Sequence, residues 1–246
     1  MAKSIIGAAL LLVVLCFGGE AAILCSKQLD IVVAVDVSGS TSRSDFNKQV
    51  AFLRTVVDAF RVSATYGARF IIFGFDHNTN SLVSSFADGK TRHKNLVQKQ
   101  INSLILSAGA TTIDGAIVQV KEFLNTTSRD VSRVVAFLTD GENYGGSESL
   151  RIPAEELRTL YEAKVIGLGV GATNTINLEA FEILTGRKDR HFILQFKKSN
   201  SCSGDDDSDC ECSEGEDEDD GDEDEGDGGC GNSELKRAVN LICGEN

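Results

Sequence analysis

Two hydrophobic patterns alternate along this chain from residue 28 onward. Continuous apolar runs, typical of strands buried on both faces, occupy 30–37, 68–75, 82–86, 133–139, 164–170 and 191–196. Helical spacing between them predicts helices over 43–61, 92–106, 113–124, 154–162 and 178–184. This alternation predicts an α/β fold, a doubly wound, mostly parallel six-stranded sheet with helices on both faces. The run at 82–86 follows Phe75 after a short polar turn, so we expect it to pair antiparallel at the sheet edge.

The two ends of the chain have different patterns. Residues 1–22 combine Lys3, an apolar stretch over 5–17 and small residues near a cleavage point, which predicts a secretory signal peptide. Near the other end, Leu235, Val239 and Ile242 fall on one face of a predicted helix. Because a tail needs no amphipathic helix at its end, we interpret 199–231 as an insertion. The predicted domain then comprises 23–198 and 232–246.

Charge is concentrated in that insertion. The chain has a net charge of −13, but 199–231 holds 16 Asp and Glu residues and no Lys or Arg. The rest of the chain after residue 22 carries 20 acidic and 23 basic residues. Such a segment repels itself and buries little apolar surface, so we expect it to be disordered. It is also a candidate for low-affinity Ca²⁺ binding.

Several features favour an extracellular chain. Cys16 lies in the predicted leader, and the even number of remaining cysteines favours disulfides: Cys25, Cys202, Cys210, Cys212, Cys230 and Cys243. Asn125 begins a glycosylation sequon. No later stretch approaches about 20 apolar residues, so we expect no membrane span.

Oxygen-bearing side chains gather where predicted strands end. The first strand runs into Asp36, Ser38 and Ser40. Taken alone, this turn has two interpretations, helix-capping serines or an oxygen-only site for Mg²⁺, Mn²⁺ or Ca²⁺. Thr111 precedes a predicted helix and Asp140 follows a buried strand, so both are expected at the same edge of the sheet as Asp36.

Other chemistries are poorly supported. Glycines 167, 169 and 171 lack the spacing and the ribose-binding acid of a dinucleotide fingerprint. The histidines are scattered, and the sequence has no nucleophile elbow or P-loop. The short basic patch at 92–94 is too small to predict nucleic-acid binding. We therefore expect a non-enzymatic protein.

The order Asp-x-Ser-x-Ser, Gly-x-Thr, Thr-Asp-Gly resembles that of the von Willebrand factor A domain family, which includes the integrin inserted domains. The resemblance covers about 25–198 and 232–244 and implies a metal-ion-dependent adhesion site. Carried over by position, its metal-contacting residues are Asp36, Ser38, Ser40, Thr111 and Asp140. The loop departs from the commoner Thr-x-Thr form, because Ile113 occupies the second position and Thr112 precedes it.

The resemblance implies a secreted adhesion module whose bound Mg²⁺, Mn²⁺ or Ca²⁺ holds an Asp or Glu of an extracellular partner, such as collagen or another matrix protein. It also implies a disulfide between Cys25 and Cys243, since family members with cysteines at both ends commonly close the domain this way. The other four cysteines then pair in one of three ways. The alternative is an acidic, calcium-binding structural protein of a matrix or biomineral.

Overall fold

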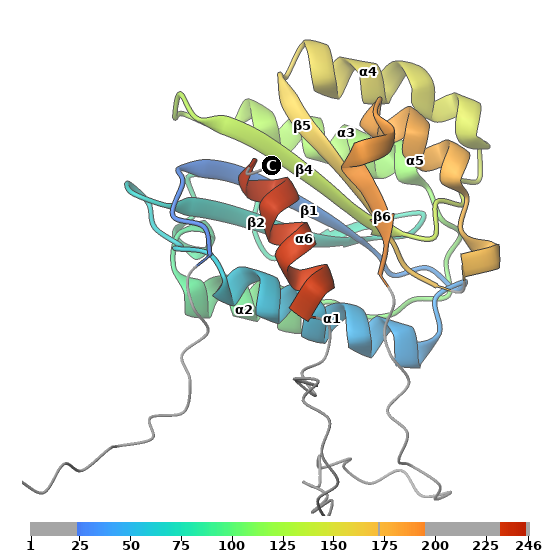
Figure 1. Ribbon diagram of the computed structural model, residues 1–246, viewed down its shortest axis with the longest axis horizontal. Helices are drawn as coiled ribbons and strands as arrows, with labels where there is room; N and C mark the ends of the chain where they lie inside the picture. Colours follow the sequence, from blue (N-terminus) through green and yellow to red (C-terminus); the bar gives the residue numbers. More distant parts are fainter. Residues whose placement is uncertain (1–23, 172, 195–231, 245–246) are drawn as a thin grey trace, which may run out of the picture.

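The computed structural model describes residues 24–171, 173–194 and 232–244 (Figure 1). The predicted signal peptide, the acidic insertion and its four cysteines lie outside these residues. Among the described helices, none has the length and apolar character needed to cross a membrane.

A six-stranded sheet forms the centre of the molecule, in the order β3-β2-β1-β4-β5-β6. All neighbouring strands are parallel except β2 and β3, which are antiparallel. This confirms the predicted doubly wound sheet. All eight residues of β1 are buried, as expected of a central strand covered on both faces. The strands are β1 (Leu29–Asp36), β2 (Ala68–Phe75), β3 (Thr79–Ser81), β4 (Ser132–Thr139), β5 (Ala163–Gly169) and β6 (His191–Ile193).

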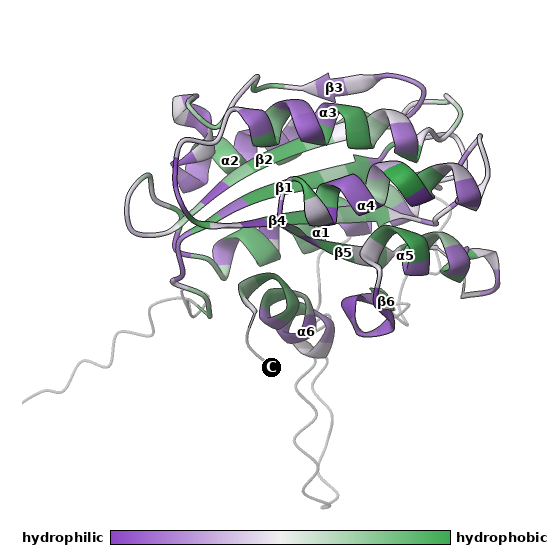
Figure 2. Ribbon diagram, turned by 90° about the horizontal axis from the view of Figure 1, so that it is seen from above, coloured by the Kyte–Doolittle hydropathy of each residue, from purple (hydrophilic) through white to green (hydrophobic). Residues whose placement is uncertain are grey.

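Helices cover both faces of this sheet (Figure 2). One apolar core contains residues of α1, α2 and α6, and the other contains residues of α3, α4 and α5. The helices are α1 (Arg43–Asp58), α2 (Lys94–Asn102), α3 (Ile113–Asn125), α4 (Arg151–Thr159), α5 (Leu178–Thr185) and α6 (Asn232–Cys243). Short 3₁₀ turns are η1 (Gly89–Thr91), η2 (Ser147–Leu150), η3 (Thr173–Thr175) and η4 (Lys188–Arg190).

The predicted edge strand at 82–86 is wrong in position. An antiparallel edge strand does follow β2, but it is β3, where Thr79 pairs with Phe75. Two of the apolar residues of 82–86, Val83 and Phe86, are buried in the core instead, whereas Leu82 is exposed. Backbone groups of Phe86 bond to the Arg69 and Thr126 side chains, which replaces strand pairing.

Helix boundaries also differ from the prediction: the helix expected over 43–61 ends at Asp58, and two other helices are shifted or shorter. The helix expected over 154–162 is α4, which begins at Arg151 and ends at Thr159; Pro153 is tolerated in its first turn, where the missing N–H costs no hydrogen bond. The helix expected over 92–106 ends at Asn102. The chain then enters a loop, in which the Ser107 N–H donates to the carbonyl of Val37.

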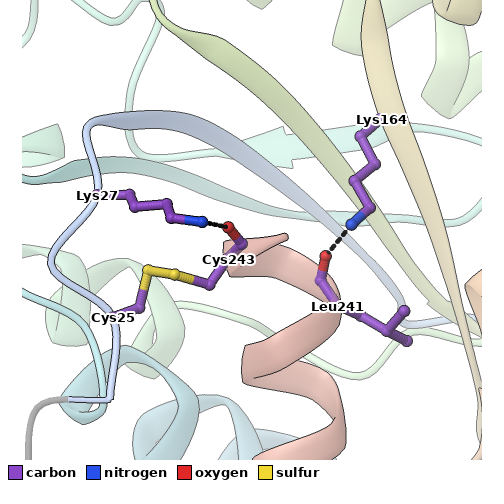
Figure 3. The surroundings of a disulfide bond; sticks show 5 residues. All are labelled: Cys25, Lys27, Lys164, Leu241 and Cys243. Atoms are coloured by element: carbon purple, nitrogen blue, oxygen red, sulfur yellow. Dashed lines mark hydrogen bonds between the residues drawn. A yellow bond between two sulfur atoms is a disulfide. The ribbon is translucent and has the colours of Figure 1, made fainter. Parts of the chain in front are cut away.

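The edge at which the parallel strands begin, here called the amino pole, is firmly joined to α6. Cys25 and Cys243 form a disulfide with a Cα–Cα distance of 6.0 Å. Lys27 Nζ donates to the carbonyl of Cys243 over 3.0 Å, and Lys164 Nζ donates to that of Leu241 (Figure 3). Two ammonium groups thus contact the carboxyl end of α6, where the helix dipole favours positive charge.

Candidate metal centre

The opposite edge, where the parallel strands end, is here called the carboxyl rim. Asp36 is the last residue of β1, and the turn that follows carries Ser38 and Ser40. This turn is held by the Ser38 N–H, which donates to Asp36 Oδ1 over 2.9 Å. Thr111 approaches from the loop before α3, and Asp140 directly follows β4. The ends of β1 and β4 and the loop before α3 therefore bring the candidate residues to one rim.

Three of these residues are joined through their hydroxyl groups. Thr111 Oγ1 lies 2.8 Å from Ser38 Oγ, which lies 3.1 Å from Ser40 Oγ. Ser38 and Thr111 are buried, whereas Ser40 is exposed, so the row of oxygens runs from the interior to the surface. Ser40 and Asp140 also line one pocket of about 100 Å³ together with Asp45.

The buried Asp36 carboxylate is affected by its surroundings at this rim. Burial raises the pKa of Asp36 above its ordinary range, and the Asp140 carboxylate acts in the same direction. Hydrogen bonds from Ser38 and Thr139 oppose this shift. A cation beside the two acids would offset the cost of burying the Asp36 charge, and hydroxyl and carboxylate oxygens are the donors that Mg²⁺, Mn²⁺ and Ca²⁺ take. The donor set therefore fits a hard divalent cation.

Thr139 orients the Asp36 carboxylate, a role that the sequence pattern did not reveal. Its hydroxyl donates to Asp36 Oδ2 over 2.7 Å and accepts from the Gly141 N–H over 3.1 Å. Gly141 has φ +84°, and a Cβ there would lie 2.7 Å from the carbonyl of Asn177. The Thr-Asp-Gly turn thus holds Asp36 through the Thr139 hydroxyl group and carries Asp140 directly after Thr139. The signal in the sequence is the triplet itself, in which only Asp140 is an expected ligand.

A second network, also missed, holds the loop that carries Thr111. Asp76, directly after β2, accepts a hydrogen bond from Ser107 Oγ, and its backbone carbonyl accepts from the Thr112 hydroxyl. Gly109 passes so close that a Cβ there would lie 2.3 Å from Asp76 Oδ2. Thr112 therefore bonds to Asp76, while Thr111 bonds to Ser38. The position of Asp76 after a buried strand, like that of Asp36, was its only signal in the sequence.

In the described part of the chain, no group of three or more His, Cys, Asp and Glu side chains is arranged to hold a metal. The candidate centre differs from such a group, because three of its five side chains contribute a hydroxyl oxygen. His77 lies beside Asp76, with its Nδ1 3.3 Å from Asp76 Oδ2. The arrangement therefore offers oxygen donors to a cation, with no imidazole or thiolate among the five.

Comparison with known proteins identifies the family. The family model for the von Willebrand factor type A domain matches residues 30–203. The chain belongs to this family. The match stops before α6, yet Ala238, Val239 and Ile242 of α6 lie in the same core as β1 and α1.

Relatives of this von Willebrand factor type A chain are distant. Cuticlin-6 of Caenorhabditis elegans is 22% identical over 170 residues, which cover 69% of this chain and 28% of the relative. Human integrin alpha-D is 25% identical over 122 residues, 48% of this chain and 10% of the relative. The chain thus spans less than a third of the length of these curated relatives.

Solved structures share the fold. Proximal thread matrix protein 1 of the mussel byssus, with a zinc-occupied MIDAS motif, has a TM-score of 0.59 and 21% identity over 70% of this chain and 42% of that chain. Manganese-loaded Plasmodium vivax TRAP protein has a TM-score of 0.58 and 18% identity over 69% of both chains. At these identities the likeness establishes the fold alone.

Proposed function

We propose that this chain is a secreted binding module that uses a divalent cation to hold a carboxylate of an extracellular protein partner. The observation that carries the proposal is the contact between the Thr111, Ser38 and Ser40 hydroxyls beside two mutually repelling carboxylates. The proposed cation ligands are Asp36, Ser38, Ser40, Thr111 and Asp140.

The chemistry of this donor set supports binding of an acidic group. Hydroxyl oxygens carry no net charge, so two carboxylates at most balance a divalent cation. Mg²⁺ prefers six oxygen ligands and keeps several waters when the protein supplies few. An Asp or Glu carboxylate from a partner can take one of those water positions. Mg²⁺ or Mn²⁺ is our preferred ion, and the manganese-loaded and zinc-occupied relatives favour a divalent cation in general.

An extracellular setting fits the covalent features and the relatives. The disulfide between Cys25 and Cys243 suits an oxidising compartment, and Asn125 is exposed at the end of α3, where a glycan could be attached. A byssus thread matrix protein and an integrin subunit are among the similar proteins, which favours a matrix or adhesion partner, with collagen as one candidate.

Metal binding is tested directly with Mn²⁺ by electron paramagnetic resonance. Because the acidic residues of 199–231 also attract cations, that segment is replaced by a Gly/Ser linker in every protein compared. Asp140→Ala should remove one Mn²⁺ site. Asp130→Ala, which removes an exposed acid from the loop preceding β4, is the matched control and should leave the site intact. Equal Mn²⁺ stoichiometry and affinity in both variants would contradict the proposal.

The second candidate, an acidic matrix protein, is favoured by the 16 carboxylates of 199–231. There the acidic segment gathers Ca²⁺ or contacts mineral, and the folded domain is an anchor. Replacing 199–231 by the linker discriminates the two. Loss of matrix or mineral association with Mg²⁺-dependent adhesion intact favours this candidate, and the opposite result favours the cation-dependent module.

A further inference from the structure

An exposed aromatic side chain lies next to the proposed cation site. Tyr144 is 86% exposed and follows Asp140 by four residues, in the loop between β4 and η2. Single exposed apolar residues are common on protein surfaces and carry no inference by themselves. What distinguishes Tyr144 is that its backbone is fixed to the site while its ring is left in solvent.

Hydrogen bonds fix the loop on both sides of this residue. The Tyr144 N–H donates to the Thr111 carbonyl over 2.9 Å, so the tyrosine is attached to a proposed cation ligand. The preceding Asn143 is buried, and its Oδ1 accepts from the Ile113 N–H over 2.8 Å. Its Nδ2 donates to Ser149 Oγ over 2.8 Å. The backbone of this loop is therefore ordered before any partner arrives.

Such an arrangement lowers the cost of binding. A tyrosine presents a large, rigid ring with few rotatable bonds, and aromatic residues dominate binding hot spots. Because the backbone is already held, little further ordering is needed on association. Ile105, 70% exposed, lies two residues before Ser107, whose N–H donates to Val37 at the same rim. Apolar surface is thus available on two loops around the site.

The acidic side chains near Tyr144 restrict which partner segments can bind there. Asp140 is partly exposed and Glu142 is exposed, and both lie between the end of β4 and Tyr144. These acids disfavour a partner segment with several carboxylates. One carboxylate can reach the cation, and its neighbours contact the ring best when they are uncharged and apolar.

We propose that Tyr144 is a specificity-determining residue that selects partner segments in which an aliphatic or proline side chain lies within about three residues of the coordinating carboxylate. An extended chain advances about 3.3–3.6 Å per residue, and the Tyr144 backbone is bonded to that of Thr111, so a more distant side chain would pass beyond the ring. This inference rests on the proposed cation site, because the carboxylate sets the register of the segment.

The test uses the full secreted chain and a synthetic peptide library. Each peptide holds one fixed Glu, with the three positions on either side randomised among uncharged residues, and binding is compared in Mg²⁺ and in chelator. The variants are Tyr144→Ala, Tyr144→Phe and the control Tyr66→Ala. Tyr66 is 64% exposed and precedes β2 at the amino pole, far along the strands from the rim.

We expect Mg²⁺-dependent enrichment of aliphatic or proline residues at one position by the native chain. Tyr144→Ala should reduce the ratio of apolar-flanked to glycine-flanked binding about tenfold, a moderate hot-spot effect. Tyr144→Phe and Tyr66→Ala should retain that ratio. Mg²⁺-dependent binding with an unchanged ratio in Tyr144→Ala would overturn this inference alone.

Two other outcomes would also overturn the role of Tyr144 in partner selection. Binding that is equal in Mg²⁺ and chelator would overturn the proposed function and, with it, the role of Tyr144. Sedimentation that shows a native dimer converted to monomer by Tyr144→Ala would assign the ring to self-association and overturn its role in partner selection.

Discussion

Replacing Asp36 by Asn should separate the stability of the domain from its ability to bind a cation. Asp36 is 1% exposed, burial raises its pKa, and Asp140 repels it. Asn has nearly the same shape. Its Oδ1 can accept from the Ser38 N–H, and its Nδ2 can donate to the Thr139 hydroxyl oxygen. The substitution therefore removes the buried charge while it keeps the packing and both hydrogen-bonded neighbours.

The expected magnitudes have opposite signs with and without the cation. In chelator, Asp36→Asn should raise the free energy of unfolding, because it removes a carboxylate whose charge is disfavoured by burial and by Asp140. With free Mg²⁺ at about 100 times its Kd, the native site should gain about 2.7 kcal/mol and the variant almost nothing. For a domain of this size, about 1 kcal/mol shifts Tm by about 2–4 °C.

Thermal unfolding in chelator and in a Mg²⁺ series measures both effects. The acidic segment 199–231 is replaced by a Gly/Ser linker in both proteins, so that the response reports only the folded site. The Tm values should cross, with the Asp36→Asn variant more stable in chelator and the native protein more stable in Mg²⁺. If Mg²⁺ stabilises both proteins equally, Asp36 is not a ligand. If the variant is less stable than the native protein in chelator, the buried Asp36 charge does not destabilise the fold as we propose.

Three further predictions concern the framework. Burial raises the pKa of Asp30, but hydrogen bonds with Arg69, Thr127 and Arg129 outweigh it and hold this pKa below its ordinary value. The ionised Asp30 carboxylate should therefore stabilise the fold above about pH 4, and this stabilisation should disappear as the pH falls through the folded pKa. Asp30→Asn should cost about 3–5 kcal/mol at pH 7 and abolish that part of the acid dependence in urea unfolding. Gly109→Ala should displace the Thr111 loop, because the new Cβ meets Asp76, and should weaken Mn²⁺ affinity measured by paramagnetic resonance, whereas unchanged affinity would contradict the role of this loop. Changing both Cys25 and Cys243 to Ser opens a loop with a sequence separation of 218 and should lower stability by about 5 kcal/mol in the chain-entropy model, and a loss below about 1 kcal/mol in urea unfolding would count against that estimate.

The regular part of the fold was predictable because its signals are local. β2 spans the predicted 68–75, and the first residues of α1, α3 and α5 agree with the prediction. In each case a continuous apolar run or a helical stripe reports burial directly. The short edge strand was misplaced because Val83 and Phe86 show the apolar character of a strand while they fill the core from a loop.

The supporting contacts of the candidate centre were not predictable from the sequence. Asp76 and Thr112 are 36 residues apart, and Asp36 and Thr139 are 103 residues apart, so only the packed fold shows that they are hydrogen-bonded. The candidate ligands, by contrast, lie in recognisable short motifs, at the ends of β1 and β4 and just before α3. A residue that positions a ligand through one hydrogen bond leaves no comparable pattern along the chain.

β1 holds a buried aspartate near each end, and the two aspartates differ in whether a positively charged side chain pairs with them. This difference bears on function. Asp30, fully buried near the start of the strand, is neutralised by Arg69 and Arg129. Asp36, equally buried at its end, receives hydrogen bonds from Ser38 and Thr139, and within the described residues no Lys or Arg side chain forms an ion pair with it. At the start of β1, arginine side chains thus balance the buried carboxylate and stabilise the fold. At the rim the Asp36 carboxylate has no such arginine or lysine among the described residues, as expected if a dissolved cation binds there and owes its affinity to the unbalanced negative charge.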